Sequence, residues 1–323
     1  MGCSAVTGGI FSRSDMEAHA ECGGRLDTAL SGLPEDIPIH QPEIASVEDL
    51  RLVHPARHIR LLQELSRGEH YIDPDTCITP NSFESSLYAV GSAIAAARHA
   101  LEGEDCFALV RPPGHHAESE RAMGFCLFNN AAVAAAHAIA VQGCERVAIV
   151  DWDLHHGNGT QEIFYNKRNV LFCSVHECET FPHTGWVDEV GAGMAKGTNI
   201  NAPLRAGAEI PDYALVFQEI ISPAINRFSP DIVIISAGQD ALQDDLKGNM
   251  KLRPEDFGVL TTLIKEAGVL PLALVLEGGY GPSHGQAINH IFRALCGRHY
   301  EVTDGLPRPS TRQVVERLKK LHF

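Results

Sequence analysis

Short apolar runs alternate with longer segments of mixed character along most of the chain, from about residue 83 onward. Within the short runs, apolar and polar residues do not alternate, which is typical of strands covered on both faces of a parallel sheet. The longer segments carry apolar residues at helical spacing. The predicted strands cover residues 106–110, 146–150, 170–175, 231–236 and 270–276. The predicted helices cover residues 84–101, 130–141, 212–227, 254–267 and 312–323.

Strands that alternate with helices predict an α/β protein with a doubly wound, mostly parallel sheet. A single domain over residues 1–323 is expected, because the candidate site draws on strands from residue 106 to residue 276.

Composition excludes some classes of function. The chain has 26 Lys and Arg against 41 Asp and Glu, so its net charge of -15 argues against nucleic-acid binding. Its nine cysteines are scattered and form no C-x-x-C pair, which predicts reduced thiols in a cytoplasmic protein. No apolar run reaches the ~18–20 residues of a membrane helix. No secretory signal is visible at the N-terminus.

Polar side chains directly follow four of the predicted strands. The four segments read RPPGHH (111–116), DWDLHHGNG (151–159), AGQD (237–240) and EGGY (277–280). Ligands of open parallel sheets bind outside the carboxyl ends of the strands. The sequence therefore predicts one site at that edge of the sheet.

Asp153, His155 and Asp240 form a candidate metal site. Residues i and i+2 of an extended segment project to the same side, so Asp153 and His155 can bind one ion. Asp240 can add a third ligand from another strand end. Two carboxylates and one imidazole with an open position are typical of a catalytic site, and zinc is favoured over iron(II) or another divalent ion. Alternatively, Asp153 and His155 only cap the following helix.

The pair His115-His116 follows a tight Pro-Pro-Gly turn. One hypothesis is a general acid/base pair that faces the metal; the alternative is an exposed pair. A catalytic imidazole needs an acceptor that fixes its orientation, and Asp151 and Asn158 are the candidates.

Tyr280 follows two glycines at a strand end, where its hydroxyl could stabilise an oxyanion. The alternative is a core tyrosine. Gly124-Phe125 and Phe181 could form the walls of a narrow channel, or could be ordinary core.

Together, the motifs RPPGHH, MGFCLFNN, DWDLHHGNGT, SAG-x-DA and LEGGY closely resemble the zinc-dependent histone deacetylase superfamily, which includes acetylpolyamine amidohydrolases. The resemblance runs from about His19 to about Leu295. It is nearest to the class II and bacterial branch, because Asn158 stands where class I members carry Asp. It implies a three-layer α/β/α fold of the arginase type with a central parallel sheet.

The resemblance also implies the activity, which is zinc-dependent removal of acetyl groups from acetyl-lysine or small acylated amines. It makes Asp153, His155 and Asp240 the zinc ligands, and His115 and His116 the catalytic pair. The other roles that it implies are Asp151 and Asn158 behind the pair, Tyr280 as oxyanion donor, and Gly124, Phe125 and Phe181 as channel walls. A potassium ion is implied beside Asp151, Asp153, His155, Ser174 and Val175. His19, Glu21 and Arg25 resemble the N-terminal segment of the family.

Three positions depart from the family pattern and leave the substrate open: Gln239 replaces Phe, His183 replaces Gly, and Lys247 lies in a changed QDDLKG segment. If Lys247 points into the channel mouth, it would disfavour a cationic polyamine by like-charge repulsion.

Two other functions compete with deacylation. An arginase-type ureohydrolase would bind two manganese ions with more aspartates, whereas this chain has a single Asp240 ahead of Ala241. A protein that binds acylated ligands without hydrolysis is the second, and the intact Tyr280 and His115-His116 argue against it. Oligomeric state stays open.

Overall fold

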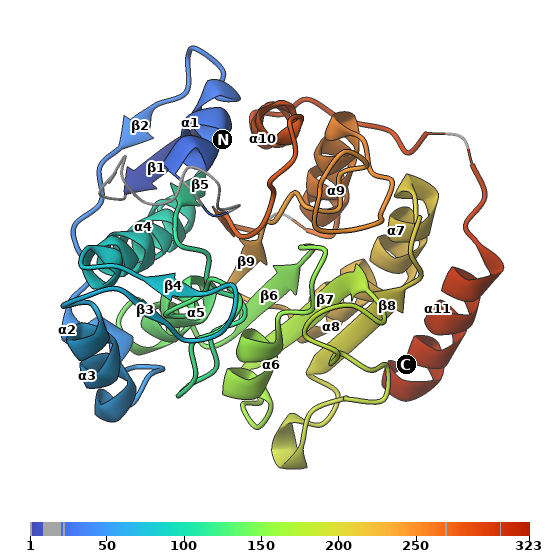
Figure 1. Ribbon diagram of the computed structural model, residues 1–323. Coiled ribbons are helices and arrows are strands. Elements are labelled where there is room, and N and C mark those ends of the chain that lie inside the picture. Colours follow the sequence, from blue (N-terminus) through green and yellow to red (C-terminus); the bar gives the residue numbers. More distant parts are fainter. Residues whose placement is uncertain (1, 9–20, 22, 269, 304) are drawn as a thin grey trace.

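The computed structural model describes residues 2–8, 21, 23–268, 270–303 and 305–323 (Figure 1). Eight strands form one sheet in the order β2-β1-β5-β10-β9-β6-β7-β8, and every neighbouring pair is parallel. A short antiparallel pair, β3 and β4, lies outside this sheet. The strands are β1 (Gly2–Gly8), β2 (Ile39–His40), β3 (His70–Tyr71), β4 (Cys77–Ile78), β5 (Glu104–Val110), β6 (Val147–Asp151), β7 (Val170–Glu177), β8 (Asn199–Leu204), β9 (Ile232–Ser236) and β10 (Leu272–Val275).

Helices flank the row of strands, with α4 and α5 on one side and α9 and α10 on the other (Figure 1). The α-helices are α1 (Gly23–Ser31), α2 (Val47–Leu50), α3 (Ala56–Leu65), α4 (Ser82–Leu101), α5 (Asn130–Ala140), α6 (Asn158–Phe164), α7 (Ile210–Val216), α8 (Ser222–Phe228), α9 (Pro254–Glu266), α10 (His284–Leu295) and α11 (Pro309–His322).

The predicted α/β fold with a parallel sheet is confirmed. Strands β6, β7 and β9 are buried along their whole length, as their unbroken apolar character predicted. The predicted helix 212–227 is instead α7 and α8 joined by a π-helical turn over Phe217–Ile221. Pro223 has no amide hydrogen to continue the α-helical ladder, which accounts for a change of hydrogen bonding just before it.

The sheet order gathers the strand ends that carry the polar motifs. Strands β5, β10, β9 and β6 are consecutive neighbours. Their carboxyl ends are level, since Ser236 of β9 pairs with both Asp151 of β6 and Val275 of β10. The segments that follow these four strands therefore meet at one edge of the sheet.

One expectation about the cysteines is wrong. Cys3 on β1 and Cys296 directly after α10 form a disulfide, with their Cα atoms 5.6 Å apart. The two residues are separated by 293 positions, so only the fold brings them within bonding distance.

No helix in the described part of the chain is long and apolar enough to cross a membrane. His19, assigned to the N-terminal family segment, lies outside the described residues, as does Cys22.

Candidate active site

Asp153, His155 and Asp240 converge at the carboxyl edge of the sheet. Their ligand atoms all lie within 4.8 Å of one another. His155 Nδ1 is 3.0 Å from Asp240 Oδ2 and 3.3 Å from Asp153 Oδ1. Both carboxylates are fully buried. A side chain at Gly238 would collide with the Asp153 carboxylate, so this close approach requires glycine.

Backbone amides hold the two carboxylates in place. Gly278 N–H donates to Asp153 Oδ2 (2.7 Å), and Leu154 N–H donates to Asp240 Oδ1 (2.8 Å). Burial, with the nearby Asp153, raises the pKa of Asp240 to about 6. A bound cation would offset this crowding of buried negative charge. Two carboxylates and one imidazole fit a divalent ion such as zinc, and the capping alternative does not explain why Asp240 joins them.

His115 and His116 are both buried, so the alternative of an exposed pair is wrong. Their ring centroids are 4.0 Å apart. His115 Nδ1 lies 3.0 Å from Asp151 Oδ2, and His116 Nδ1 lies 2.8 Å from Asn158 Oδ1. Because the Nδ1 atoms are engaged, each ring has only Nε2 left for chemistry.

The two histidines differ in electrostatic environment. Burial lowers the pKa of His115, but the carboxylates of Asp153 and Asp151 outweigh it and hold this pKa well above 6.5. Burial and the neighbouring His115 lower the pKa of His116 well below 6.5. The two environments therefore favour the charged form of His115 and the neutral form of His116, which can accept a proton.

Glu277 is a buried carboxylate under the histidine pair to which the sequence analysis gave no role. It accepts hydrogen bonds from Gly114 N–H (2.7 Å), His115 N–H (3.0 Å) and the Ser236 hydroxyl (3.0 Å). Burial raises its pKa to about 7. Its place directly after the predicted strand 270–276 and before two glycines was the signal in the sequence that could have marked it as a site residue.

Tyr280 is fixed from two sides. Its backbone N–H and that of Gly281 donate to Asp245 Oδ2, at 2.6 and 2.8 Å. The guanidinium of Arg25 lies over its ring, 4.7 Å from the centroid. Burial raises the pKa of Tyr280 well above 10 and exceeds the opposing effect of Arg25. The phenol therefore stays protonated and can donate a hydrogen bond.

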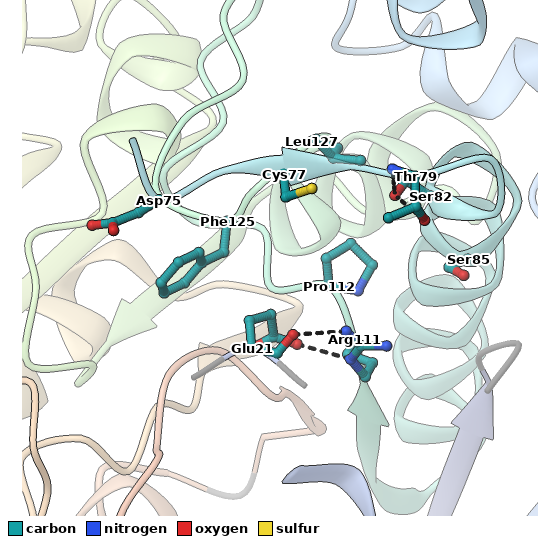
Figure 2. Close-up of a pocket in the computed structure, with 10 residues that line it drawn as sticks. All are labelled: Glu21, Asp75, Cys77, Thr79, Ser82, Ser85, Arg111, Pro112, Phe125 and Leu127. Carbon is teal, nitrogen blue, oxygen red and sulfur yellow. Dashed lines mark hydrogen bonds and ion pairs between the residues drawn. The ribbon is translucent and has the colours of Figure 1, made fainter. Parts of the chain in front are cut away.

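Glu21 links Arg25 to the RPPGHH motif. Its carboxylate is 2.7 Å from Arg25 Nη1 and 3.1 Å from Arg111 Nε. Figure 2 shows the interactions that join Glu21 and Arg111. Glu21 and Arg111 line a cavity of about 70 Å³ that also has Ser82 and Ser85 in its wall. This space fits a few water molecules rather than an acyl chain. The structure thus brings two of the three residues of the N-terminal match, Glu21 and Arg25, against the site.

A larger cavity of about 450 Å³ is lined by the three candidate metal ligands and by the histidine pair. The Phe181 ring lies 4.9 Å from that of His116, and the Phe125 ring lies 5.9 Å from that of Tyr280. Gly124 has a φ of 56°, and a side chain there would collide with His116. The aromatic residues predicted as channel walls therefore line this cavity.

The departures from the family pattern lie at different depths. Lys247 lines the cavity, with its Nζ 5.3 Å from the centroid of the Phe125 ring. Gln239 is buried, and its amide donates to the carbonyl of Ala237. His183 has a φ of 64°, the left-handed region in which glycine would be unstrained.

Of the residues assigned to potassium, Asp151 ends β6, Asp153 and His155 follow that strand, and Ser174 and Val175 lie within β7. Asp151 and Ser174 are partners in register, and Val175 is buried beside them. Asp151 Oδ1 accepts a hydrogen bond from Asp153 N–H (3.1 Å). This hydrogen bond helps to hold the segment that carries Asp153, one of the three candidate metal ligands.

The chain is similar in sequence and in structure to known proteins. Residues 19–295 match the histone deacetylase domain family. A probable deacetylase of Methanothermobacter thermautotrophicus is 37% identical over 298 residues, covering 90% of each chain. A histone deacetylase-like amidohydrolase of Pseudomonas aeruginosa is 38% identical and covers 79% of this chain and 69% of its own. The crystal structure of the HDA15 HD domain superposes with a TM-score of 0.91 at 32% identity, covering 100% of this chain and 95% of that one.

Proposed function

The chain belongs to the histone deacetylase domain family and is a hydrolase of that family, and from this premise we propose that it removes acetyl groups from amine nitrogens with one bound zinc ion. One observation carries the proposal. A single aromatic-lined cavity is bordered by the three candidate metal ligands, a buried histidine pair and a protonated tyrosine.

Asp153, His155 and Asp240 would hold the zinc ion. Zinc supplies Lewis-acid polarisation of the acyl carbonyl and lowers the pKa of a water molecule. A potassium ion beside Asp151 and Ser174 would add positive charge behind the buried carboxylates.

The side chains around the cavity can carry the proton transfers. The neutral His116 is the group that accepts a proton from water as the water oxygen attacks the acyl carbon. The Tyr280 hydroxyl donates a hydrogen bond to the oxyanion that forms. A histidine then protonates the amine nitrogen as the carbon–nitrogen bond breaks, and the products are a carboxylic acid and a free amine. His115, charged beside Asp151, stabilises the negative charge that develops.

The cavity favours a slender substrate. Phe125 and Phe181 suit the methylene stem of an acylated lysine or of a small acylated amine. Lys247 in the wall of the cavity disfavours a second positive charge on the substrate, so we place acetyl-lysine peptides ahead of acetylated polyamines.

Amine release from acylated peptides, polyamines and small aryl amides tests the proposal. We expect turnover by the zinc-loaded protein, loss of turnover on chelation, and recovery on addition of one equivalent of zinc. Urea release from a guanidino substrate with two manganese ions per chain would establish the ureohydrolase instead. Tight binding of acylated ligands by the zinc-loaded protein without turnover would establish a binding role.

A further inference from the structure

A further cavity, of about 190 Å³, shares one loop with the candidate active site. We call it the side cavity. The shared loop covers residues 178–186 and directly follows β7. Its Phe181 borders the larger cavity, whereas its His183 and Trp186 border the side cavity. Two residues of chain span at most about 7 Å, so the backbone positions of Phe181 and His183 make the two cavities neighbours.

The side cavity lies at the same edge of the sheet as the candidate active site. Pro203 of β8 forms part of its wall and pairs with His176 near the carboxyl end of β7. The candidate metal ligands also lie at the carboxyl ends of strands, and β6, β7 and β8 are consecutive in the sheet. A peptide whose acyl-lysine fills the larger cavity therefore has its neighbouring residues within reach of the side cavity.

Hydrogen bonds hold the loop that separates the two cavities. The backbone N–H groups of Gly185 and Trp186 donate to Glu189 Oε2, at 3.2 and 3.1 Å. The carbonyl of Gly185 accepts from His176 Nε2 (3.0 Å). A side chain at Gly185 would collide with His176, so this close approach requires glycine. The side cavity is thus formed before any ligand arrives, which lowers the entropic cost of binding.

Two residues in the wall favour ligand binding over simple packing. The Trp186 side chain is 55% exposed, although tryptophan is a largely buried residue in most proteins. Exposed tryptophan beside a pocket is typical of binding sites. His183 has a φ of 64°, a costly conformation for a residue other than glycine, and such residues cluster at ligand sites.

The wall of the side cavity suits a neutral, apolar occupant. Trp186, Pro203 and Cys178 present largely apolar surface to it. Glu179 is the one carboxylate among the described residues of the wall, and its Oε1 is 2.8 Å from Arg205 Nη1. This ion pair compensates the charge of Glu179, so the wall offers a charged ligand little attraction while burial of apolar surface remains favourable.

We propose that the side cavity is a specificity subsite that takes a neutral apolar side chain, one or two residues from the acyl-lysine of a peptide or protein substrate. This inference rests on the proposed deacylation and names the class of substrate. A small acylated amine has no neighbouring residue and would leave the side cavity empty. A peptide with phenylalanine beside the acyl-lysine would fill both cavities.

Kinetics of paired acetyl-lysine peptides test the proposal. The two peptides of a pair differ only in Phe or Ser at one position, one or two residues before or after the acyl-lysine. In at least one pair, we expect the wild type to prefer the Phe peptide by about 3- to 10-fold in kcat/KM, mainly through KM. Trp186→Ala and His183→Gly should bring this ratio toward one. Phe323→Ala removes a ring that is as exposed as Trp186 and lies at the end of α11, so this matched control should keep the ratio.

Tryptophan fluorescence of the zinc-loaded Tyr280→Phe variant measures peptide binding without relying on turnover. The chain has two tryptophans and Trp152 is fully buried, so a change in emission on addition of peptide reports on Trp186. We expect a larger change with the preferred Phe peptide than with its Ser partner, and none once Trp186→Phe is added.

The possible outcomes separate the subsite from the proposed function. In an active wild type, equal kcat/KM for every pair overturns the subsite, as does a preference that both Trp186→Ala and His183→Gly retain. If the wild type turns over no peptide, the proposed function fails and the emission decides: a change specific to the Phe peptide supports the subsite, and equal or absent changes overturn it.

Discussion

The guanidinium of Arg25 lies against the ring of Tyr280, although 254 residues separate Arg25 from the carbonyl of Gly279 to which it donates. Arg25 also donates to the carbonyl of Glu277 and forms an ion pair with Glu21. One buried side chain thus fixes three points of the segment that carries the tyrosine. Arg25 is not among the residues that line the cavity, so we infer that it acts by positioning Tyr280.

Arg25→Ala should therefore lower kcat more than it raises KM. Losing a side chain that orients the site costs on the order of 10- to 100-fold in activity. It also leaves the Glu21 carboxylate with less compensation, so the melting temperature should fall by several degrees. Arg317→Ala, on α11, removes an exposed ion pair with Asp188 and is the matched control. Wild-type kcat in Arg25→Ala would exclude the positioning role.

Tyr280→Phe removes one hydroxyl and leaves the ring packed against Phe125 and Arg25. We expect turnover to fall by about 10²- to 10³-fold, the scale for loss of one oxyanion donor, while zinc content stays unchanged. Steady-state kinetics and metal analysis of the same sample measure both. Tyr300→Phe, which removes a hydroxyl that hydrogen-bonds His290 and does not line the cavity, should keep full activity. Full turnover in Tyr280→Phe would remove this residue from the mechanism.

The sequence predicted those parts of the site that local rules govern. Asp153 and His155 are two residues apart after a strand, and Asp240 follows another strand of the same sheet, so alternation and topology suffice. The contacts of Arg25 and Glu277 join segments more than 160 residues apart and depend on the finished fold.

Two strands that the sequence did not predict, β1 and β8, were missed for similar physical reasons. Strand β1 reads GCSAVTG and has no apolar run, yet it pairs with β5 over seven residues. Strand β8 contains Pro203 and alternates polar with apolar residues, as an edge strand allows. Both strands form because they pair with a neighbouring strand in the fold, and the local sequence pattern does not indicate that pairing.

Lys247 should discriminate between substrates by charge. Its ammonium lies over the ring of Phe125 in the wall of the cavity, where it would repel a second positive charge on the substrate. Lys247→Glu should improve kcat/KM for an acetylated polyamine relative to a neutral acetyl-lysine peptide by about 3- to 10-fold, since partly solvated charge interactions are worth roughly 1 kcal/mol. The exposed Lys251→Glu is the charge-matched control. An unchanged ratio of the two kcat/KM values would show that Lys247 does not act on the substrate.

The pH dependence of stability should reflect His54, which is buried in a position that only the neutral ring can occupy. Its Nδ1 donates to the carbonyl of Ser119 (3.0 Å), and its Nε2 accepts from Asn129 N–H (3.0 Å). Burial, with the stacked His58 as a smaller cause, lowers the pKa of His54 to about 3. The loop that it holds reaches the histidine pair, because the Asn129 amide donates to the carbonyl of Ala117.

The direction of the pH effect on stability depends on whether the folded or the unfolded chain takes up the proton. Between pH 6.5 and about 3 the unfolded chain protonates His54 and the folded chain does not, so acid favours unfolding. The stabilisation by the neutral ring is complete above pH 6.5, and about 2 kcal/mol of it is lost by pH 5. His54→Gln keeps an acceptor for Asn129 N–H but cannot titrate, so its unfolding free energy should fall less steeply over this range. Denaturant unfolding at pH 7 and pH 5 measures the difference, with the exposed His70→Gln as control. If His54→Gln and the wild type lose the same stability between these two pH values, His54 is not the residue that senses acid.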